Sequence, residues 1–315
     1  MSETITAALL KAWPLPQPPK HSDKDARGRV LTIAGGAQVP GAAILCSLGA
    51  LRAGAGKLQM AACAPWAINL AMTMPEARVV TVPGTADGEF ALSAARPLIK
   101  LAGRVDAVII GPGMIDDAVA SPLAARLVSA LPEPAFVLDA GAITGLGPMI
   151  AQLAAKTHRL VLTPHAGEMA QILGCEKEAV LDDPLGCGRR LADALKAVVV
   201  VKGQISHIVA PGGQTWTHDG GSVGLGTSGS GDVLAGVIGG LLARGAVPAQ
   251  AAVWGVTLHG MAGSALAGRI GPLGFLAREI LDEIPRALAD VGRPAGPAAG
   301  PAGAAGSVRP SGRAV

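Results

Sequence analysis

The sequence predicts an α/β fold in which a central, mostly parallel sheet is covered by helices on both faces. Short apolar runs recur along the chain without alternating polar residues, as expected of strands that are buried on both faces. Segments with helical character lie between most of these runs, which is the pattern of a parallel sheet. Glycines and polar residues follow where each run ends, at the edge where open α/β sheets bind ligands.

The elements alternate in a regular order. The first predicted strand ends at Gly35-Gly36, and the helix that follows carries Ile44, Leu45, Leu48 and Leu51 at helical spacing. The predicted strands are 29–34, 57–62, 106–110, 135–138, 160–162 and 198–201. The predicted helices are 40–53, 116–130, 143–156, 167–173 and 186–196. Segments 207–210 and 215–217 flank a Pro-Gly-Gly turn and predict a hairpin at the end of the sheet.

Composition excludes several classes of protein. The chain has 315 residues and a net charge of +3, and its basic residues are scattered, so we expect no nucleic-acid partner. Its four cysteines are widely spaced and form no C-x-x-C pair, which favours free thiols in a reducing compartment. The first residues lack the pattern of a signal peptide. We therefore expect a cytoplasmic protein.

One apolar segment resembles a membrane span in length. No Asp, Glu, Lys or Arg lies between Arg244 and Arg269, and a span needs about 20 mostly apolar residues. This segment contains Pro248, Gln250, His259 and several small residues. It is better interpreted as one or two buried core helices, so we expect no membrane association.

The chain divides into three parts. Residues 1–27 are expected to be an irregular lead-in, because prolines 14, 16, 18 and 19 interrupt any helix. Residues 28–290 form one catalytic domain. Residues 291–315 include a tail rich in Pro, Ala and Gly, which cannot bury enough apolar area to offset chain entropy and is expected to be disordered.

The most informative segment is Gly226-Thr-Ser-Gly-Ser-Gly-Asp232, which leads into an apolar helix. Glycines allow several backbone N–H groups to converge, and a helix start adds free donors and partial positive charge. These features make a site for phosphate. Asp232 beside it is suited to take a proton from an attacking hydroxyl. An N-capping Asp is the simpler alternative, but a cap needs no run of four glycines within residues 224–231.

Other candidate site residues lie at the ends of the predicted strands. Gly36, Gly113, Asp139, His165 and Lys202 all fall there, which predicts one crevice assembled from several loops. In the segment that follows the fifth predicted strand, Glu168 could help cap the next helix, and His165 could contact a substrate or act as an acid or base. Asp139 and Glu168 could also help hold magnesium, directly or through water.

The sequence does not support three better-known motifs. Gly56-Lys57 is followed by Leu58, and position 51 is Leu, so the P-loop pattern does not match. The first strand is not followed by the dinucleotide-binding glycine pattern. The segment 220–224 matches the nucleophile elbow of hydrolases, but a second loop follows it where the elbow requires a helix.

The combination of strand-end motifs resembles one family. Ala34-Gly35-Gly36 with Pro40-Gly-Ala-Ala43, Ile110-Gly-Pro-Gly113, Leu138-Asp-Ala-Gly-Ala142, Leu162-Thr-Pro-His-Ala-Gly-Glu168, Val201-Lys-Gly203 and Gly226–Asp232 occur in the order typical of ADP/ATP-dependent NAD(P)H-hydrate dehydratases, which have a ribokinase-like fold. The resemblance covers about residues 20–290. It implies an enzyme that phosphorylates the hydroxyl of hydrated NADH or NADPH with ADP or ATP, after which loss of phosphate restores the cofactor.

The resemblance also implies roles for individual residues. Ala42, Gly113, His165 and Asp232 would contact the hydrated dinucleotide, and Asp232 would be the catalytic base. Lys202, Gly203, Gln204, Ile205, Ser206 and Gly231 would bind the adenine nucleotide. We expect its terminal phosphate to lie in the Thr227–Gly231 nest, which includes Gly229, together with magnesium. The metal ligands stay unassigned.

Some positions depart from the family pattern. The family loop usually reads G-T-G-G-T-G-D, whereas this chain has Ser228 and Ser230, and Gly36 stands where Ser is common. Many relatives carry an epimerase domain before this one, and only a short lead-in precedes it here, so we expect a monofunctional chain. The family suggests a homo-oligomer, a tetramer. The sequence leaves open ADP against ATP, and NADH hydrate against NADPH hydrate. A ribokinase-like kinase for a vitamin precursor or sugar, and a non-catalytic nucleotide-binding protein, remain the alternative functions.

Overall fold

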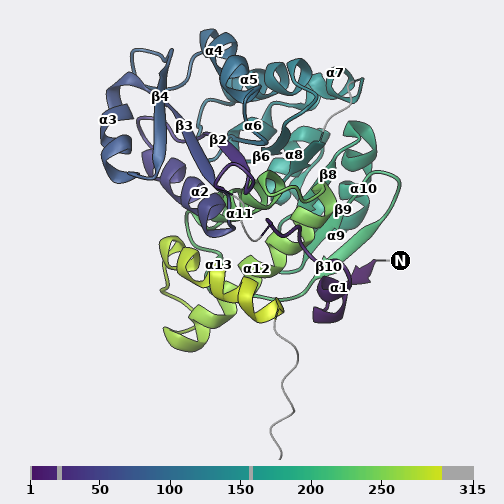
Figure 1. Cartoon of the computed structure of the whole chain (residues 1–315). Coiled ribbons are helices and arrows are strands. Elements are labelled where there is room, and N and C mark those ends of the chain that lie inside the picture. The colour runs from purple at the N-terminus through teal and green to yellow at the C-terminus, as the bar shows by residue number, and fades with distance from the viewer. Residues whose placement is uncertain (1, 20–22, 156–158, 293–315) are drawn as a thin grey trace, which may run out of the picture.

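The computed structural model describes residues 2–19, 23–155 and 159–292. Its strands are β1 (Glu3–Thr4), β2 (Arg29–Ile33), β3 (Lys57–Cys63), β4 (Ala77–Val82), β5 (Ala107–Ile110), β6 (Ala135–Leu138), β7 (Arg159–Leu162), β8 (Val198–Val201), β9 (Ser206–Val209) and β10 (Thr215–His218). They form one sheet in the order β1-β10-β9-β8-β7-β6-β5-β2-β3-β4 (Figure 1). Strands β2 to β8 pair in parallel, and β9 runs antiparallel to both β8 and β10. The predicted sheet and terminal hairpin are therefore confirmed.

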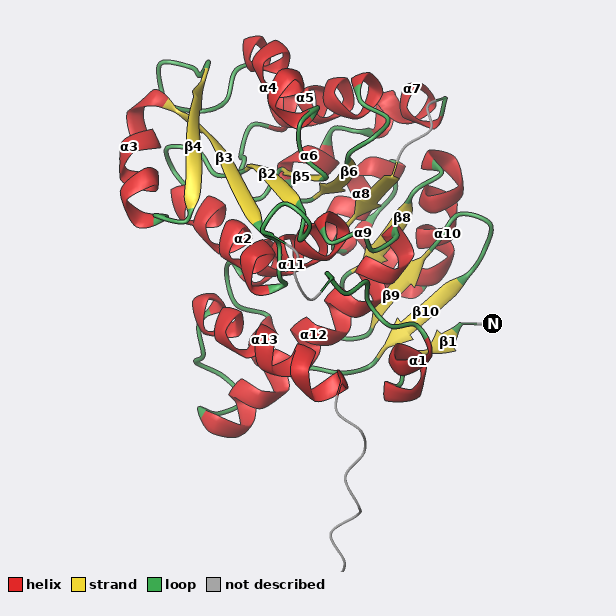
Figure 2. Ribbon diagram, in the orientation of Figure 1, coloured by secondary structure: helices red, strands yellow, loops and turns green. Residues whose placement is uncertain are grey.

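Helices surround this sheet (Figure 2). They are α1 (Ala7–Ala12), α2 (Pro40–Arg52), α3 (Ala64–Thr73), α4 (Ala95–Ala102), α5 (Asp117–Ala130), α6 (Gly141–Thr144), α7 (Ile150–Ala154), α8 (Ala166–Leu173), α9 (Lys177–Asp182), α10 (Pro184–Leu195), α11 (Ser230–Ala243), α12 (Pro248–Arg269) and α13 (Ala277–Gly292), with short 3₁₀ turns η1 (Leu92–Ala94), η2 (Gly147–Met149) and η3 (Val223–Leu225). Helices α2, α11 and α12 pack on the sheet together, and α13 packs against them.

Sequence analysis missed strands β1 and β4 and helices α3, α4, α9 and α13, and it predicted one helix where the structure has three shorter elements. Strand β4 lies at the edge of the sheet, and most of its residues are partly or fully exposed, so it shows no continuous apolar run. The single helix predicted over 143–156 is instead broken into α6, η2 and α7 within the residues described there. Pro148 lies inside η2, where it interrupts regular helical hydrogen bonding.

The described part of the lead-in, residues 2–19 and 23–27, is not irregular throughout, which corrects part of that prediction. Strand β1 pairs in parallel with β10, and α1 is capped by Thr6. The prolines do end the helical conformation after α1, but two of their carbonyl groups accept hydrogen bonds. Gln250 donates to Pro14 O and Arg244 donates to Pro16 O. The ring of Trp13 stacks on that of Trp216 with centroids 5.7 Å apart. At the other end, α13 continues to Gly292, and the rest of the predicted tail lies outside the described residues.

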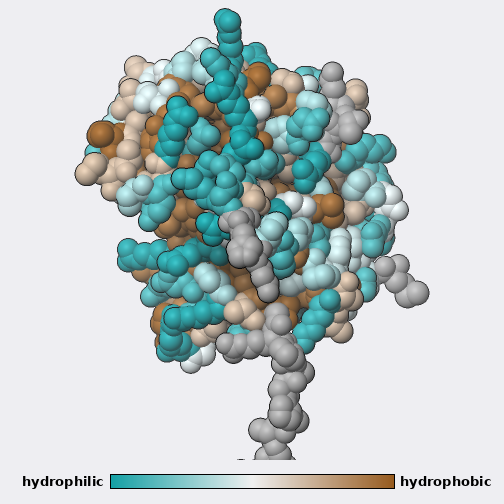
Figure 3. All heavy atoms as spheres, in the orientation of Figure 1, coloured by the Kyte–Doolittle hydropathy of each residue, from teal (hydrophilic) through white to brown (hydrophobic). Residues whose placement is uncertain are grey.

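The apolar segment before Arg269 forms α12, a buried core helix, as expected. Among the described residues, no helix combines the length and apolar character needed to cross a membrane. Figure 3 shows hydrophilic residues spread over one face of the molecule, with smaller hydrophobic areas between them.

Close packing of α2 against α11 positions the candidate phosphate loop. A Cβ added at Gly236 would overlap the backbone of Cys46, and one added at Gly240 would overlap the backbone of Ala50. A Cβ at Gly49 would lie 2.8 Å from the carbonyl oxygen of Val233. These glycines let the two backbones approach closely.

We predict that Gly236→Ala destabilises the protein by about 1–3 kcal/mol, although Ala is the better helix former, because the new methyl group overpacks the α2–α11 contact. Gly268→Ala in α12 is the matched control, since a Cβ there meets nothing within 4 Å. It should be neutral or slightly stabilising. Urea unfolding of both variants measures the difference, and equal stabilities would contradict the packing argument.

Candidate active site

The phosphate loop ends in a nest at the start of α11. Gly229 has a φ of 87° and precedes the helical Ser230, a left-handed-then-right-handed pair that points successive N–H groups into one concavity. A Cβ at Gly229 would lie 2.5 Å from Leu45 Cδ1, so both conformation and space require glycine there. Asp232 is the third residue of α11, and the N-cap is Gly229 without a side-chain hydrogen bond. The alternative role of Asp232 as an N-cap is therefore excluded.

A buried ion pair lies beside this nest. Lys202, which follows β8, places Nζ 2.8 Å from Oδ1 of Asp139 and 3.8 Å from Oε2 of Glu168. Thr163 Oγ1 donates to the same Asp139 oxygen at 2.6 Å. Burial by itself would lower the pKa of Lys202, but the charges of Asp139 and Glu168 and the hydrogen bond that Lys202 donates to Asp139 raise it above its ordinary value. Lys202 is therefore a permanent cation, and Nζ lies 3.5 Å from where a Cβ of Gly231 would be.

The carboxyl group of Asp232 is tuned by the same cluster. Burial raises its pKa, the negative charge of Asp139 raises it further, and Lys202 lowers it, with the result of a pKa of about 7. A carboxyl group with that value exchanges protons near neutral pH, which is the best condition for a general base. The nest, the cation and the base together are suited to phosphoryl transfer.

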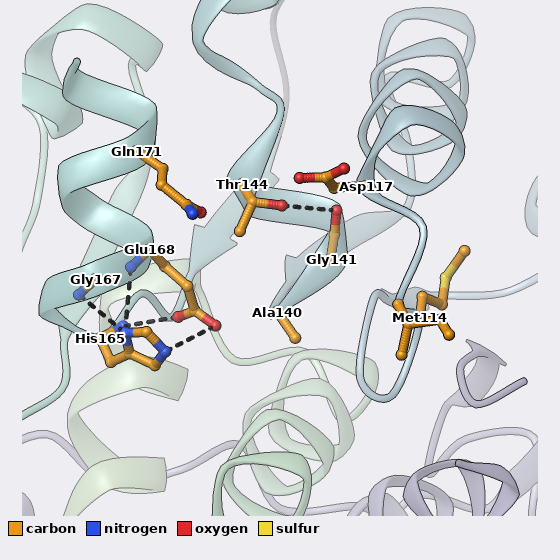
Figure 4. Close-up of a pocket in the computed structure, with 10 residues that line it drawn as sticks. Met114, Asp117, Ala140, Gly141, Thr144, His165, Gly167, Glu168 and Gln171 are labelled. Carbon is orange, nitrogen blue, oxygen red and sulfur yellow. Dashed lines mark hydrogen bonds and ion pairs between the residues drawn. The ribbon is translucent and has the colours of Figure 1, made fainter. Parts of the chain in front are cut away.

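His165 is held by its own helix. Its Nδ1 accepts hydrogen bonds from the N–H groups of Gly167 and Glu168, and Glu168 Oε2 accepts from the His165 N–H, which forms a capping box (Figure 4). The expected capping role of Glu168 is confirmed. Because Nδ1 is an acceptor, the neutral ring carries its proton on Nε2, which lies 3.5 Å from Glu168 Oε1. His165 can offer an N–H donor, but Nδ1 is not free to act as a base.

A cavity of about 380 Å³ opens next to His165 (Figure 4). It is lined by His165 and Glu168 of the α8 start, by Ala140, and by Thr144 of α6. Ala140 has a φ of 47° and ψ of −124°, a conformation that is strained for any residue with a Cβ. The turn is closed by a 3.1 Å hydrogen bond from Ala142 N to Asp139 O, so the strained residue connects the ion pair to the cavity wall.

The remaining predicted site residues form two groups. Gly113 and Ala42 touch: a Cβ at Gly113, whose φ is 68°, would overlap that of Ala42. Gly203 to Ile205 form the turn between β8 and β9, directly after Lys202, and Ser206 begins β9; Gln204 and Ile205 are exposed. Thr227 O accepts from Ser230 N at 3.3 Å, which closes the loop before the nest.

The expectation that Asp139 and Glu168 bind magnesium directly is not supported. Lys202 Nζ contacts both carboxylates, and in the described part of the chain no group of three or more His, Cys, Asp or Glu side chains is arranged to hold a metal. A site with few protein ligands still fits Mg²⁺, because this ion is commonly held by substrate phosphates, water and one or two carboxylates.

Comparison with known proteins decides the family. The family model for NAD(P)H-hydrate dehydratase matches residues 30–286. The chain is 46% identical over 286 residues to an ADP-dependent (S)-NAD(P)H-hydrate dehydratase from Xanthomonas campestris, covering 90% of this chain and 96% of that one. The chain belongs to the NAD(P)H-hydrate dehydratase family.

Solved structures agree with this assignment. The ADP/ATP-dependent NAD(P)H-hydrate dehydratase from Bacillus subtilis, crystallised with ATP and Mg²⁺, has a TM-score of 0.80 at 27% identity and covers 92% of this chain and 99% of its own. A hydroxyethylthiazole kinase from Pyrococcus horikoshii, with a TM-score of 0.55 at 19% identity and coverage of 84% and 89%, shares the ribokinase-like fold alone. Other members of the dehydratase family are bifunctional repair enzymes. This chain spans about half of their length: it covers 53% of one such enzyme, to which it is 36% identical.

Two departures from the dehydratase family's loop pattern are accommodated. Ser228 is not among the described residues with positive φ, which excludes the strain that a side chain could have caused there. Ser230 keeps a hydroxyl group, but the hydroxyl points away from the nest: Oγ lies 2.9 Å from His259 Nε2, whose ring is buried in α12. Burial lowers the pKa of His259 to about 4, so the ring is neutral.

Sequence analysis did not predict the contact between Ser230 and His259. Its one visible signal was a histidine inside an apolar helix, a position where a polar ring needs a partner. His259 Nε2 also lies 3.1 Å from Ser230 O, so α12 holds the first residue of α11 through both its side chain and its backbone.

We predict that Ser230→Ala lowers the free energy of unfolding by about 1 kcal/mol or more, because His259 loses a buried hydrogen-bond partner. Ser230→Thr keeps the hydroxyl and should recover most of the loss. Ser228→Ala removes an exposed hydroxyl from the same loop and is the control. Urea unfolding of the three variants is the measurement. An S230A variant as stable as S228A would show that the contact with His259 contributes nothing.

Proposed function

We propose that this protein is an ADP-dependent (S)-NAD(P)H-hydrate dehydratase, which repairs hydrated NADH and NADPH. The observation that carries the proposal is Asp232, a base with a pKa of about 7, placed on the first turn of α11 beside a phosphate nest and a buried cation. The relative from Xanthomonas campestris, which has this activity by name, matches 90% of the chain.

The nucleotide binds at the β8–β9 turn and the nest. Residues 203–206 take the nucleoside part, and Thr227, Gly229 and Gly231 surround the terminal phosphate with backbone donors. Lys202 adds a positive charge that is fixed in place by Asp139 and Glu168. Magnesium, held by the phosphates and water, would neutralise further charge on the transferred group.

The hydrated dinucleotide binds on the other side of Asp232. Gly113 and Ala42 form a surface without bulky side chains, so the ligand can approach the backbone closely. His165 offers Nε2–H at the rim of the cavity, which can take part of the ligand. We propose these three residues as substrate contacts, as the family resemblance implies.

The reaction then follows from the geometry. Asp232 takes the proton of the ring hydroxyl, whose oxygen attacks the terminal phosphorus of ADP, and AMP leaves. The N–H groups of the nest and Lys202 stabilise the charge on the phosphoryl oxygens during transfer. The ring carbon then loses inorganic phosphate, the neighbouring carbon loses a proton, and the double bond of the reduced nicotinamide is restored.

We also propose that the protein acts in the cytoplasm and as a homo-oligomer. The cysteines Cys46, Cys63, Cys175 and Cys187 are all free, which supports a reducing compartment. The oligomeric state rests on the family resemblance.

A repair assay tests the function. Purified protein is mixed with chemically hydrated NADH, magnesium and either ADP or ATP, and the return of reduced-nicotinamide absorbance is followed. We expect recovery with ADP. Absence of recovery with either nucleotide, in protein that still binds ADP, would exclude the dehydratase and indicate a small-molecule kinase.

We predict that Asp232→Asn lowers turnover by about 10²–10⁴-fold, the typical contribution of a general base, and leaves ADP affinity nearly unchanged. In the wild type, kcat/KM should rise with pH and level off above about 7, because the base must be deprotonated. The variant should lose this pH dependence. Steady-state rates from pH 5.5 to pH 8.5 measure both effects, and a fully active D232N would remove Asp232 from the mechanism.

A further inference from the structure

A carboxylate outside the proposed catalytic cluster lies against the turn that leads to Ala42. Glu89 belongs to the segment between β4 and η1, and its side chain fills the space beside Gly36: a Cβ at Gly36 would overlap Glu89 Oε2 and lie 2.7 Å from Oε1. Gly36 lies three residues after the end of β2, and the N–H of Gly35 donates to Pro112 O at 2.7 Å, directly before Gly113 of the proposed substrate surface. Glu89 therefore borders the proposed substrate surface.

The segment that carries Glu89 is ordered by its own contacts. Thr85 N donates to Glu89 O at 2.8 Å, and Glu89 N donates to Thr85 Oγ1 at 3.2 Å. Trp66 Nε1 donates to Gly88 O at 2.9 Å, which ties the segment to α3. The backbone that carries Glu89 is thus held in place without a ligand.

One oxygen of this carboxylate has no hydrogen-bond partner among the described residues. Oε1 of Glu89 is buried and accepts no hydrogen bond within the part of the chain that the structure describes. No Lys or Arg occurs from 79 to 95, whereas Asp87 adds a second negative charge. A buried oxygen of this kind is costly unless a donor reaches it, and it repels a phosphate.

We propose that Glu89 accepts a hydrogen bond from a ribose hydroxyl at the adenosine end of the hydrated dinucleotide, and that it selects NADH hydrate over NADPH hydrate. This inference rests on the proposed function. The reacting ring lies at Asp232, near Asp139 at the end of β6, and Gly36 lies two strands away in the sheet, roughly 10 Å. Glu89 therefore meets a part of the ligand remote from the ring. A carboxylate suits a ribose hydroxyl there and disfavours the 2′-phosphate that NADPH carries.

The departure at Gly36 fits this role. A serine at this position, which is common in the family, cannot coexist with Glu89 in its observed place, because the added Cβ would overlap the carboxylate. The absence of a side chain at position 36 is what admits Glu89 to the substrate surface.

The test compares the two hydrates with three proteins: the wild type, Glu89→Gln and Asp87→Asn. The wild type should show kcat/KM for NADH hydrate about tenfold or more above that for NADPH hydrate, since tenfold needs only about 1.4 kcal/mol of repulsion. Glu89→Gln should raise kcat/KM for NADPH hydrate, chiefly through KM, and bring the two values together. Asp87→Asn removes an exposed charge from the same segment and should keep the wild-type preference.

Two further arms keep the outcomes distinct. Gly36→Ser should displace the carboxylate and reduce the preference in the wild type, but change nothing in Glu89→Ala, with thermal melting confirming that each variant is folded. Calorimetric titration with each hydrate measures the preference without turnover. A wild type without preference, or an unchanged ratio in folded E89Q, overturns the inference. A preference in binding that E89Q abolishes, in a protein that repairs neither hydrate, would uphold it and refute the proposed activity.

Discussion

The buried ion pair between Asp139 and Lys202 is the interaction on which the site depends. It joins the ends of β6 and β8, which are not neighbours in the sheet, and Thr163 at the end of the intervening β7 bonds to the same oxygen. Both charges are withdrawn from water, so removing either one would leave the other uncompensated, at a typical cost of about 3–5 kcal/mol. The pair also sets the opposing fields that act on Asp232.

Two features of the site lower the stability of the folded protein: the raised pKa of Asp232 and the backbone strain at Ala140. The folded state holds the proton of Asp232 more tightly than the unfolded chain does. The free energy of unfolding therefore falls as the pH rises from 3.8 to about 7. Ala140 adds backbone strain at the cavity wall. The close contact of α2 with α11 and the buried contact of Ser230 with His259 keep the loop in place despite these costs.

Most of the sheet could be predicted from sequence because buried parallel strands leave continuous apolar runs, as Val198–Val201 does. Strands β1 and β4 could not, because they are short or exposed at the sheet edges. The strand-end rule predicted that Asp139, His165 and Lys202 lie close together, since parallel strands bring their carboxyl ends to one edge, and the structure places them there. It could not show that Lys202 reaches Asp139, that Ser230 turns toward His259, or that Glu89 occupies the space left by Gly36. Those contacts depend on side-chain reach between segments far apart in sequence.

The pairing of β1 with β10 has a consequence for synthesis. Glu3 and Thr4 pair with Trp216 and Thr217, and Trp13 O receives its bond from Trp254 in α12. Glu3 and Thr4 therefore have no native partner until about two hundred more residues have been made. This segment must therefore dock late, after the parallel strands have been made, and it covers part of the edge of β10, which would otherwise be open to pairing with another chain.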